Sequence, residues 1–558
     1  MRSRLLSFLL LATLSSVVAL GFGAGLPTAD AVTYTPITGE GSSWAANAID
    51  DWRADVVNKG IKVNFAATGS VAGLTGFAQG TDDFAASDIP FGIKTVTPDV
   101  PSRSFAYVPD VAGGTALMYN LSVGGKQFTN LKLSGPTIAG IFEGKIREWN
   151  DPKIKADNPG VALPLLKITP VVRSDGAGST AQFTLWMKSQ FSSVWTCGEV
   201  SFFTQCPSGV YDPTVQQAKS GDNGVAGFVA QAGNVGSIGY VEYSYALQSG
   251  YPVAKVLNKA GVYVLPTASN VAVALLKAKV NTNSANPNTY LTQDLSAVYV
   301  DTDPRAYPIS SYSYFVIPTT TNNGFNTQKG QTLGAFTQYA LCQGQQKAPA
   351  LGYSPLPINL AEAGLAQVKK IPGAVASTIN IKSCNNPTFS SSGVNTLATQ
   401  ALYPDKCDKL GAAATCVYGS PISGTKASST SGQGDNNAAG NHSSGNTGST
   451  TTTSTGTTGT GNTTGTGIPG TGSTATSGPS SSGGSGGAST ISLTNPDGKT
   501  SCDADTGQCT ALAASPIVVS GSPGSTFSRW AIWIAIVVLL VVILVPPSIV
   551  LLGRRAAR

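Results

Sequence analysis

The sequence predicts an α/β protein of two lobes, folded between residues 32 and about 420 of the 558-residue chain. Strand-like and helix-like patterns alternate along this part, as they do in α/β folds. This part holds about 390 residues, and a single hydrophobic core rarely organises so long a chain. Two lobes are therefore favoured over one. From about residue 421 the composition changes to serine, threonine and glycine, which ends the predicted folded part.

Three segments carry the clearest local signals. IKVNFAAT (61–68) alternates polar and apolar residues and is predicted to be a strand, as is LKITPVVR (166–173). The segment 42–60 begins with two serines and ends at a glycine, which predicts a helix. The apolar residues of this helix fall on one face, which we expect to be buried: Ile49, Trp52 and Val56.

The first 31 residues have the organisation of a secretory signal peptide. Arg2 and Arg4 precede a long apolar run, and ADA (29–31) has small residues where a signal peptidase cleaves. The alternative is an N-terminal anchor that is not cleaved. We expect a signal peptide at 1–31, which would carry the folded part out of the cytoplasm.

A second apolar run, at 529–553, is predicted to cross a membrane. It has no charged residue from Trp530 to Leu552, which is 23 residues and enough to cross about 30 Å of hydrocarbon. The arginine-rich tail 554–558 follows, and positive residues favour the cytoplasmic side. We therefore expect a single-pass cell-membrane protein whose N-terminal domain is extracytoplasmic and whose C-terminus is cytoplasmic.

Between the folded part and this helix lies a segment rich in serine, threonine and glycine, residues 421–528. Such a composition buries too little apolar surface to fold, so we expect a disordered, flexible tether. Near 495–510 the tether contains a small island with two cysteines, which we expect to form a disulfide-closed loop.

The net charge of +6 gives little support to nucleic-acid binding. Residues 1–31 carry a net charge of +1 and residues 529–558 a net charge of +4, which leaves +1 for everything between them. The basic residues are therefore a membrane-topology signal, and no nucleic-acid partner is predicted.

Eight cysteines suit an oxidising, extracytoplasmic compartment. The sequence alone does not settle how they pair. Short spacing favours three pairs and leaves a fourth: Cys197–Cys206, Cys407–Cys416, Cys502–Cys509 and Cys342–Cys384. Metal ligation is the alternative, but the chain has no C-x-x-C pair and its single histidine, His442, lies in the tether. No metal or other cofactor is predicted.

The most informative pattern is a strand followed by a Gly/Ser/Thr turn and then a helix. It occurs three times, at TGEGSSW (38–44), ATGSVAG (67–73) and RSDGAGST (173–180). Each turn would aim free backbone N–H groups, at the positive end of a helix dipole, toward a small anion. Because such turns gather at the carboxyl ends of strands in an open α/β sheet, we expect one shared anion site.

Three charged residues are candidates for that site. Arg173 can bond an oxyanion through two N–H groups, and Asp175 can hold its guanidinium in place; the alternative is a surface ion pair of little consequence. Asp88, in DFAASDIPF (83–91), can only accept hydrogen bonds when ionised, so it favours a ligand that still carries a proton. Monohydrogen phosphate has such a proton and sulfate has none. The alternative for Asp88 is a turn or helix-capping residue.

These segments resemble the phosphate-binding proteins of bacterial ABC-type phosphate transporters, and the likeness covers most of residues 35–360. Further segments that carry it are GIFEGKIREWND (140–151), GDNGVAGFV (221–229), IGYVEYSYA (238–246) and AYPISSYSYFVI (306–317). The resemblance implies a type II periplasmic-binding-protein fold, in which a hinge joins two lobes and phosphate binds in the cleft between them. It places lobe 1 at about 32–108 and 305–375, and lobe 2 at about 109–304.

The resemblance also implies a set of phosphate-binding residues. They are Ser43, Trp44, Ser70, Asp88, Arg173, Asp175, Ala177, Gly178 and Ser179. Ala177 stands where the family commonly has serine, which removes one hydroxyl donor and keeps the backbone N–H. Trp44 replaces the usual phenylalanine, a conservative change if its role is an amide donor and a hydrophobic plug.

We therefore expect a monomeric, extracytoplasmic substrate-binding component that captures inorganic phosphate and delivers it to an ABC permease in the membrane. Two alternatives are a cell-surface adhesion or structural protein, which the Ser/Thr-rich tether favours, and a binding protein for another oxyanion. An enzyme is not predicted, because the folded part has no histidine to serve as a base and no recognisable set of metal ligands.

Overall fold

The computed structural model describes residues 33–423, apart from residues 323, 376–378 and 391. The predicted signal peptide, the tether from residue 424 onward, its cysteine island and the predicted membrane helix at 529–553 lie outside the described residues. Among the residues that are described, no helix is both long enough and apolar enough to span a membrane.

The framework is an eight-stranded sheet with the strand order β2-β1-β3-β15-β4-β10-β8-β9. In chain order, its strands are β1 (Ile37–Gly41), β2 (Val63–Ala66), β3 (Phe84–Ser87), β4 (Phe105–Tyr119), β8 (Thr169–Arg173), β9 (Gln217–Lys219), β10 (Ser237–Glu242) and β15 (Ser310–Pro318). β1 pairs in parallel with β2 and β3, and β8 pairs in parallel with β9 and β10. In each half of the sheet, the carboxyl ends of these strands therefore lie at a shared edge.

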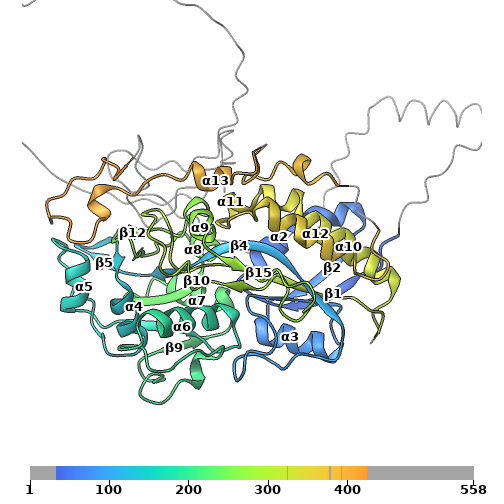
Figure 1. The fold of residues 1–558 in the computed structure, drawn as a ribbon. Coiled ribbons are helices and arrows are strands. Elements are labelled where there is room, and N and C mark those ends of the chain that lie inside the picture. The colour runs from blue at the N-terminus through green and yellow to red at the C-terminus, as the bar shows by residue number, and fades with distance from the viewer. Residues whose placement is uncertain (1–32, 323, 376–378, 391, 424–558) are drawn as a thin grey trace, which may run out of the picture. The chain divides into compact units, whose positions relative to one another are not determined.

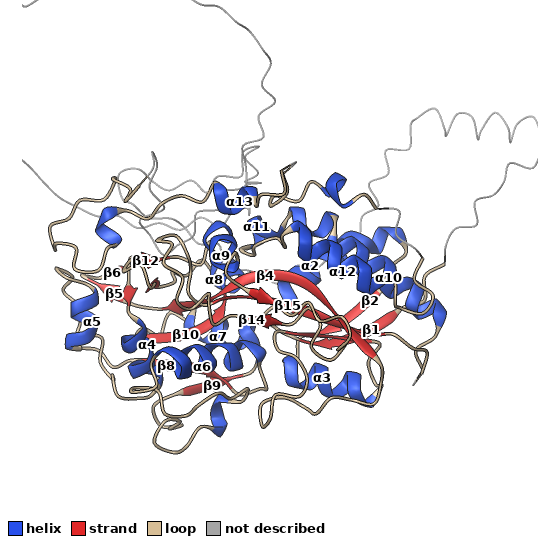
Figure 2. Cartoon of the chain, in the orientation of Figure 1, coloured by secondary structure: helices blue, strands red, loops and turns tan. Residues whose placement is uncertain are grey.

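The long strand β4 belongs to both halves of the sheet. Its residues 105–114 pair antiparallel with β15, and its residues 115–119 pair antiparallel with β10. Figure 2 shows β4 and β15 side by side, running through the middle of the domain. A separate hydrophobic core lies on each side of this connection, one containing Trp52 and Phe315 and the other containing Trp149 and Phe183. The predicted two-lobed α/β fold is confirmed.

Helices cover the sheet in both lobes (Figure 1). The α-helices of the described residues are α2 (Ala46–Val56), α3 (Ser70–Gln79), α4 (Gly135–Phe142), α5 (Pro152–Asp157), α6 (Gly178–Gln190), α7 (Gly221–Val229), α8 (Tyr243–Ser249), α9 (Ala268–Leu275), α10 (Thr327–Leu341), α11 (Ala348–Leu351), α12 (Ile358–Val368) and α13 (Thr396–Thr399). The short strands are β5 (Ser122–Val123), β6 (Lys126–Gln127), β7 (Lys132–Leu133), β11 (Lys255–Leu257), β12 (Tyr263–Val264), β13 (Lys279–Val280) and β14 (Gln293–Asp294). In the first lobe α3 and α10 pack against β1, and in the second α7 packs against β8 and β10.

The three elements predicted from local patterns are present. β2 lies within the strand predicted at 61–68, and β8 lies within the strand predicted at 166–173. The helix predicted at 42–60 is α2 followed by a 3₁₀ turn, and Gly60 ends it in the left-handed region with φ of 79°. Its predicted apolar face is fully buried: Ile49, Trp52 and Val56.

The described chain beyond α12 packs on both lobes. The disulfide Cys342–Cys384 joins the end of α10 to this C-terminal segment. Further along, Asp408 forms a buried ion pair with Lys255 of β11, in the second lobe, at 2.8 Å. Three of the predicted disulfides are present, and they are Cys197–Cys206, Cys342–Cys384 and Cys407–Cys416.

Candidate functional site

Each of the three predicted strand–turn–helix segments has that structure. β1 leads into α2, β2 into α3 and β8 into α6. The N-cap residue of each helix, Ala45, Gly69 or Ala177, makes no side-chain hydrogen bond to the helix. The first N–H groups of these helices have no intrahelical acceptor either. The three turns therefore keep backbone donors at the positive ends of three helix dipoles.

Asp88 follows β3 and is 2% exposed. Its carboxylate accepts hydrogen bonds from the hydroxyl groups of Ser42, at 2.5 Å, and Ser70, at 3.2 Å. Burial raises the pKa of Asp88 to about 6, aided by the charge of Asp222 and opposed by the two serine hydroxyls and by Arg173. Asp88 caps no described helix, which excludes the helix-capping alternative, but it lies in a bend after β3, as the turn alternative expects.

Arg173 ends β8 and is 1% exposed, which excludes the alternative of a surface ion pair. Its Nε donates to Asp175 Oδ1 at 2.8 Å, and its Nη2 donates to Asp175 Oδ2. Its Nη1 donates to Ser179 Oγ at 3.2 Å. Burial would lower the pKa of Arg173, but the charges of Asp222 and Asp175 raise it overall, so the guanidinium stays charged.

Asp175 anchors the turn after β8. Burial would raise the pKa of this carboxyl, but its hydrogen bonds with Arg173 and the charge of that residue hold it below its ordinary value. Asp175 Oδ1 also accepts the N–H of Gly221, at 2.9 Å, from the start of α7. Asp175 therefore fixes the guanidinium and ties two turns of the second lobe together.

A third carboxylate, Asp222, completes this cluster and was not among the predicted site residues. Its Oδ2 accepts hydrogen bonds from Arg173 Nη1 at 2.5 Å and from Ser43 Oγ at 2.6 Å. Its Oδ1 accepts the N–H of Glu242 at 2.8 Å, and the residue is fully buried. The sequence offered one signal for Asp222, an acidic residue in the first turn of a helix. Its segment, 221–229, had been noted only because it resembles the phosphate-binding family. Its contact with Ser43, 179 positions away, arises from tertiary packing.

The two lobes approach closely at these turns. The N–H of Val71, in the first lobe, donates to the carbonyl of Gly176, in the second, at 2.9 Å. A Cβ atom at Gly178 would lie 2.7 Å from Asp88 Cβ and 2.7 Å from Ser70 Oγ. Glycine at position 178 therefore allows the start of α6 to reach the acidic residue of the opposite lobe.

Trp44 and Ala177 have less direct relations to the cluster. Trp44 is 1% exposed, and its indole N–H donates to Thr115 Oγ1 at 3.2 Å. Its backbone N–H has no hydrogen-bond acceptor among the described residues. The N–H of Ala177 donates to the carbonyl of Ser201 at 2.9 Å. Ala177 has no hydroxyl group, and its one donor, the backbone N–H, is already bonded within the protein.

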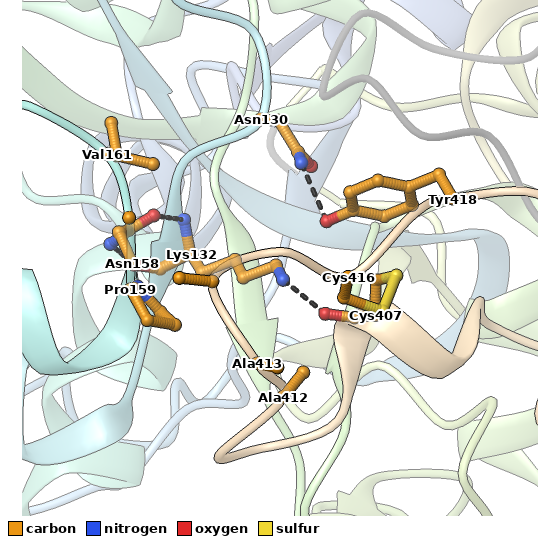
Figure 3. Close-up of a pocket in the computed structure, with 12 residues that line it drawn as sticks. Asn130, Lys132, Asn158, Pro159, Val161, Cys407, Ala412, Ala413, Cys416 and Tyr418 are labelled. Carbon is orange, nitrogen blue, oxygen red and sulfur yellow. Dashed lines mark hydrogen bonds between the residues drawn. A yellow bond between two sulfur atoms is a disulfide. The ribbon is translucent and has the colours of Figure 1, made fainter.

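A separate cavity of about 170 Å³ lies between β7 and the C-terminal segment (Figure 3). Figure 3 shows Lys132 Nζ donating to the carbonyl of Cys407 and the Asn130 amide donating to the Tyr418 hydroxyl. Asp408 lies 3.5 Å from Lys132 Nζ and compensates its charge. These contacts hold the C-terminal segment on the second lobe and leave the arginine cluster as the better anion site. The described part of the chain contains no group of three or more side chains suited to a metal ion.

Comparison with known proteins shows the family to which this chain belongs. A family model described as a PBP superfamily domain matches residues 26–343. The phosphate-binding protein PstS of Xylella fastidiosa (strain Temecula1) is 34% identical over 339 residues, which cover 60% of this chain and 85% of that protein. The chain belongs to the PstS family. PstS of Haemophilus influenzae is 33% identical over 342 residues, covering 60% of this chain and 92% of its own.

The PstS assignment confirms the resemblance stated from the sequence. It also confirms that the protein is not an enzyme, since the PstS relatives are binding proteins by name. The three turns, Asp88 and Asp222 all fall within the matched residues 26–343. The C-terminal segment that carries Cys384 and Asp408 lies beyond them.

Proposed function

We propose that this protein is the substrate-binding component of an ABC-type phosphate transporter. It captures inorganic phosphate between its two lobes and delivers it to a permease in the membrane. The observation that carries the proposal is the buried Arg173, which is held by Asp175 and bonds Ser179 at the start of α6. The PstS relatives, which are named for phosphate binding, support the choice of ligand.

The second lobe supplies most of the positive charge of the proposed site. A guanidinium has five N–H groups, and Asp175, Asp222 and Ser179 occupy four of those of Arg173. The remaining N–H, together with the backbone N–H groups of Gly178 and Ser179 at the start of α6, bonds phosphate oxygens. Asp175 keeps the guanidinium in the orientation that this requires.

The first lobe supplies hydroxyl and amide donors and one acceptor. The Trp44 backbone N–H donates to a phosphate oxygen. The Ser43 and Ser70 hydroxyls, which donate to Asp222 and Asp88 in the structure, turn to donate to phosphate when it binds. Asp88, when ionised, accepts a hydrogen bond from a protonated phosphate oxygen, and it repels a ligand that has none. Asp88 is therefore the residue that discriminates phosphate from sulfate.

Ala177 forms part of the wall of the proposed site. Its methyl group offers no hydroxyl, and its N–H is already bonded to Ser201. We expect the missing hydroxyl bond to weaken phosphate binding by about 1 kcal/mol relative to serine at this position.

We further propose that the domain acts outside the cytoplasm, after removal of the signal peptide 1–31, and that residues 529–553 anchor it through the tether. The disulfides Cys197–Cys206, Cys342–Cys384 and Cys407–Cys416 support an oxidising compartment. A domain anchored in this way stays near the permease that it serves.

Calorimetric titration of the purified protein with phosphate, and then with sulfate, tests the proposal. We expect saturable heat with phosphate and little with sulfate. The Asp88→Asn variant should bind sulfate better relative to phosphate, because an amide can donate to an unprotonated oxygen. Asp99→Asn removes a carboxylate from an exposed position of the same lobe and serves as the control.

Two outcomes of this titration would contradict the proposal. Equal affinity for sulfate and phosphate would retain an oxyanion site and overturn the ligand. Absence of heat with either ion, from a folded sample freed of bound ligand, would overturn the transport role and favour the surface-protein alternative.

A further inference from the structure

We propose that Asp222 makes this site specific for the monobasic form of phosphate, H₂PO₄⁻, by accepting a second ligand proton opposite the one that Asp88 accepts. The inference rests on the proposed function, because it names the protonation state of the same ligand. The resemblance stated from the sequence assigned Asp222 no role in binding.

Asp222 lies among the donors that the ligand needs. Its Oδ2 is bonded by Arg173 Nη1 and by Ser43 Oγ, at 2.5 and 2.6 Å. Its backbone N–H also faces Ser43 Oγ, at 3.1 Å. A phosphate oxygen that is held by Arg173 and Ser43 is therefore a neighbour of the Asp222 carboxylate.

Asp222 cannot move away without breaking other contacts. Its Oδ1 accepts the N–H of Glu242, at the end of β10, at 2.8 Å. Asp222 belongs to the first turn of α7, where the helix dipole favours a negative charge. The side chain is fully buried, so water does not screen its charge. The carboxylate is a fixed part of the site.

The titratable groups around Asp222 come from several elements. They are Arg173 on β8, Asp175 in the turn after it, Asp88 after β3, Glu242 on β10, Tyr245 on α8 and Tyr353 after α11. Burial raises the pKa of Glu242 well above its ordinary value and raises the pKa of both tyrosines. Arg173 is the one cation of this set, and it faces three carboxylates.

This charge balance disfavours a dianion. Asp175 already engages Arg173 through two hydrogen bonds, which leaves Asp88 and Asp222 as two further acceptors. A dibasic phosphate has one O–H and satisfies one of them, so an unprotonated oxygen would face the other carboxylate. Monobasic phosphate has two O–H groups for two acceptors and carries one negative charge instead of two. Its two unprotonated oxygens remain for Arg173 and the N–H groups.

The inference has a thermodynamic consequence that can be measured. Above the second pKa of phosphate the dibasic form predominates in solution, so binding must take up one proton. The dissociation constant for total phosphate should then rise about tenfold per pH unit. At the acid end, Asp88 loses its acceptor role as the pH falls below its pKa of about 6. Affinity should therefore be greatest between these two values.

Calorimetric titration of the full-length protein with inorganic phosphate, in two buffers of different ionisation enthalpy, counts the protons taken up. Above the second pKa of phosphate we expect close to one proton per phosphate for the wild type. Asp222→Asn should take up almost none and lose most of the tenfold dependence per pH unit. Glu148→Gln, which removes an exposed carboxylate from the same lobe, is the matched control and should behave like the wild type.

The results separate this inference from the proposed function. Phosphate binding without proton uptake, or an Asp222→Asn variant with the wild-type proton count, overturns the role of Asp222 and leaves phosphate binding intact. Absence of phosphate binding at every pH overturns the proposed function itself. The number of protons that the wild type takes up is measured without any variant. It therefore still tests the specificity for monobasic phosphate if Asp222→Asn fails to fold.

Discussion

Replacing Arg173 with methionine would leave Asp175 and Asp222 without the cation that bonds both. Methionine preserves most of the apolar stem and removes the charge, so the change tests the ion pairs rather than the packing. Arg173 and Asp222 are 1% and 0% exposed in their side chains. Breaking a buried pair by removing one partner costs about 3–5 kcal/mol, because the remaining charge is buried without compensation. We expect a loss of that size in the free energy of unfolding near neutral pH.

The penalty should depend on pH in a definite direction. In the wild type, Arg173 holds the pKa of Asp175 below its ordinary value, so this carboxylate contributes stability above that ordinary value and loses it as the pH falls through the lowered pKa. The variant lacks this contribution, and protonation can relieve its stranded carboxylates. The difference between wild type and variant should therefore shrink as the pH falls below the ordinary pKa of an aspartate, about 4.

Urea denaturation at several pH values measures this difference, and calorimetry on the same samples measures phosphate affinity. We expect the Arg173→Met variant to bind phosphate at least about 100-fold more weakly, the equivalent of one charge-assisted hydrogen bond. Arg305→Met is the matched control, because Arg305 bonds Asp303 through the same two nitrogens, Nε and Nη2, in a more exposed pair. Its loss of stability should be about 1 kcal/mol or less.

Two results would refute the reasoning. If Arg305→Met costs as much as Arg173→Met, burial does not govern the energy of these pairs. If the Arg173→Met penalty is the same at acid and alkaline pH, uncompensated carboxylates are not its cause.

Two further predictions concern stability. Burial raises the pKa of Asp110, on β4, to about 8, so this residue contributes stability that is lost as the pH rises toward that value. Between about pH 5 and about pH 8 wild-type stability should fall by up to 1.4 kcal/mol per pH unit more than that of Asp110→Asn, and equal slopes in urea denaturation would contradict this. The disulfide Cys342–Cys384 spans 42 residues, so replacing both cysteines with serine should cost about 4 kcal/mol. The Cys197–Cys206 pair, which spans 9 residues, should cost about 2.5 kcal/mol on the same test, and the reverse order would contradict the loop-entropy argument.

The local features of the site could be predicted from the sequence. The turns at 38–44, 67–73 and 173–180 combine glycine, hydroxyl residues and the start of a helix, which are signals of short range. Parallel pairing of β1 with β2 and β3 then brings the carboxyl ends of these strands to one edge. For these features, neighbouring residues hold the information that determines the structure.

The contacts between distant segments could not be predicted in the same way. Asp222 reaches Arg173 and Ser43 only because α7 packs beside β8 and because the two lobes meet. The acid in its segment has an ordinary role at the first turn of a helix, and nothing local separates that role from a role in binding. The ion pair of Asp408 with Lys255 was missed for the same reason, since a lone lysine and a lone aspartate carry no pairing signal.

We infer that the arrangement of charges between the lobes would link phosphate binding to closure of the lobes. The second lobe holds the cation Arg173, while the first holds the acceptor Asp88 and the donor Ser43, so neither lobe alone can satisfy a protonated oxyanion. Ser43 of the first lobe bonds Asp222 of the second, and both residues belong to the proposed site. A ligand with the wrong number of protons would therefore weaken the contact between the lobes as well as its own binding. On this argument, selection of the ligand and closure of the lobes share the same hydrogen bonds.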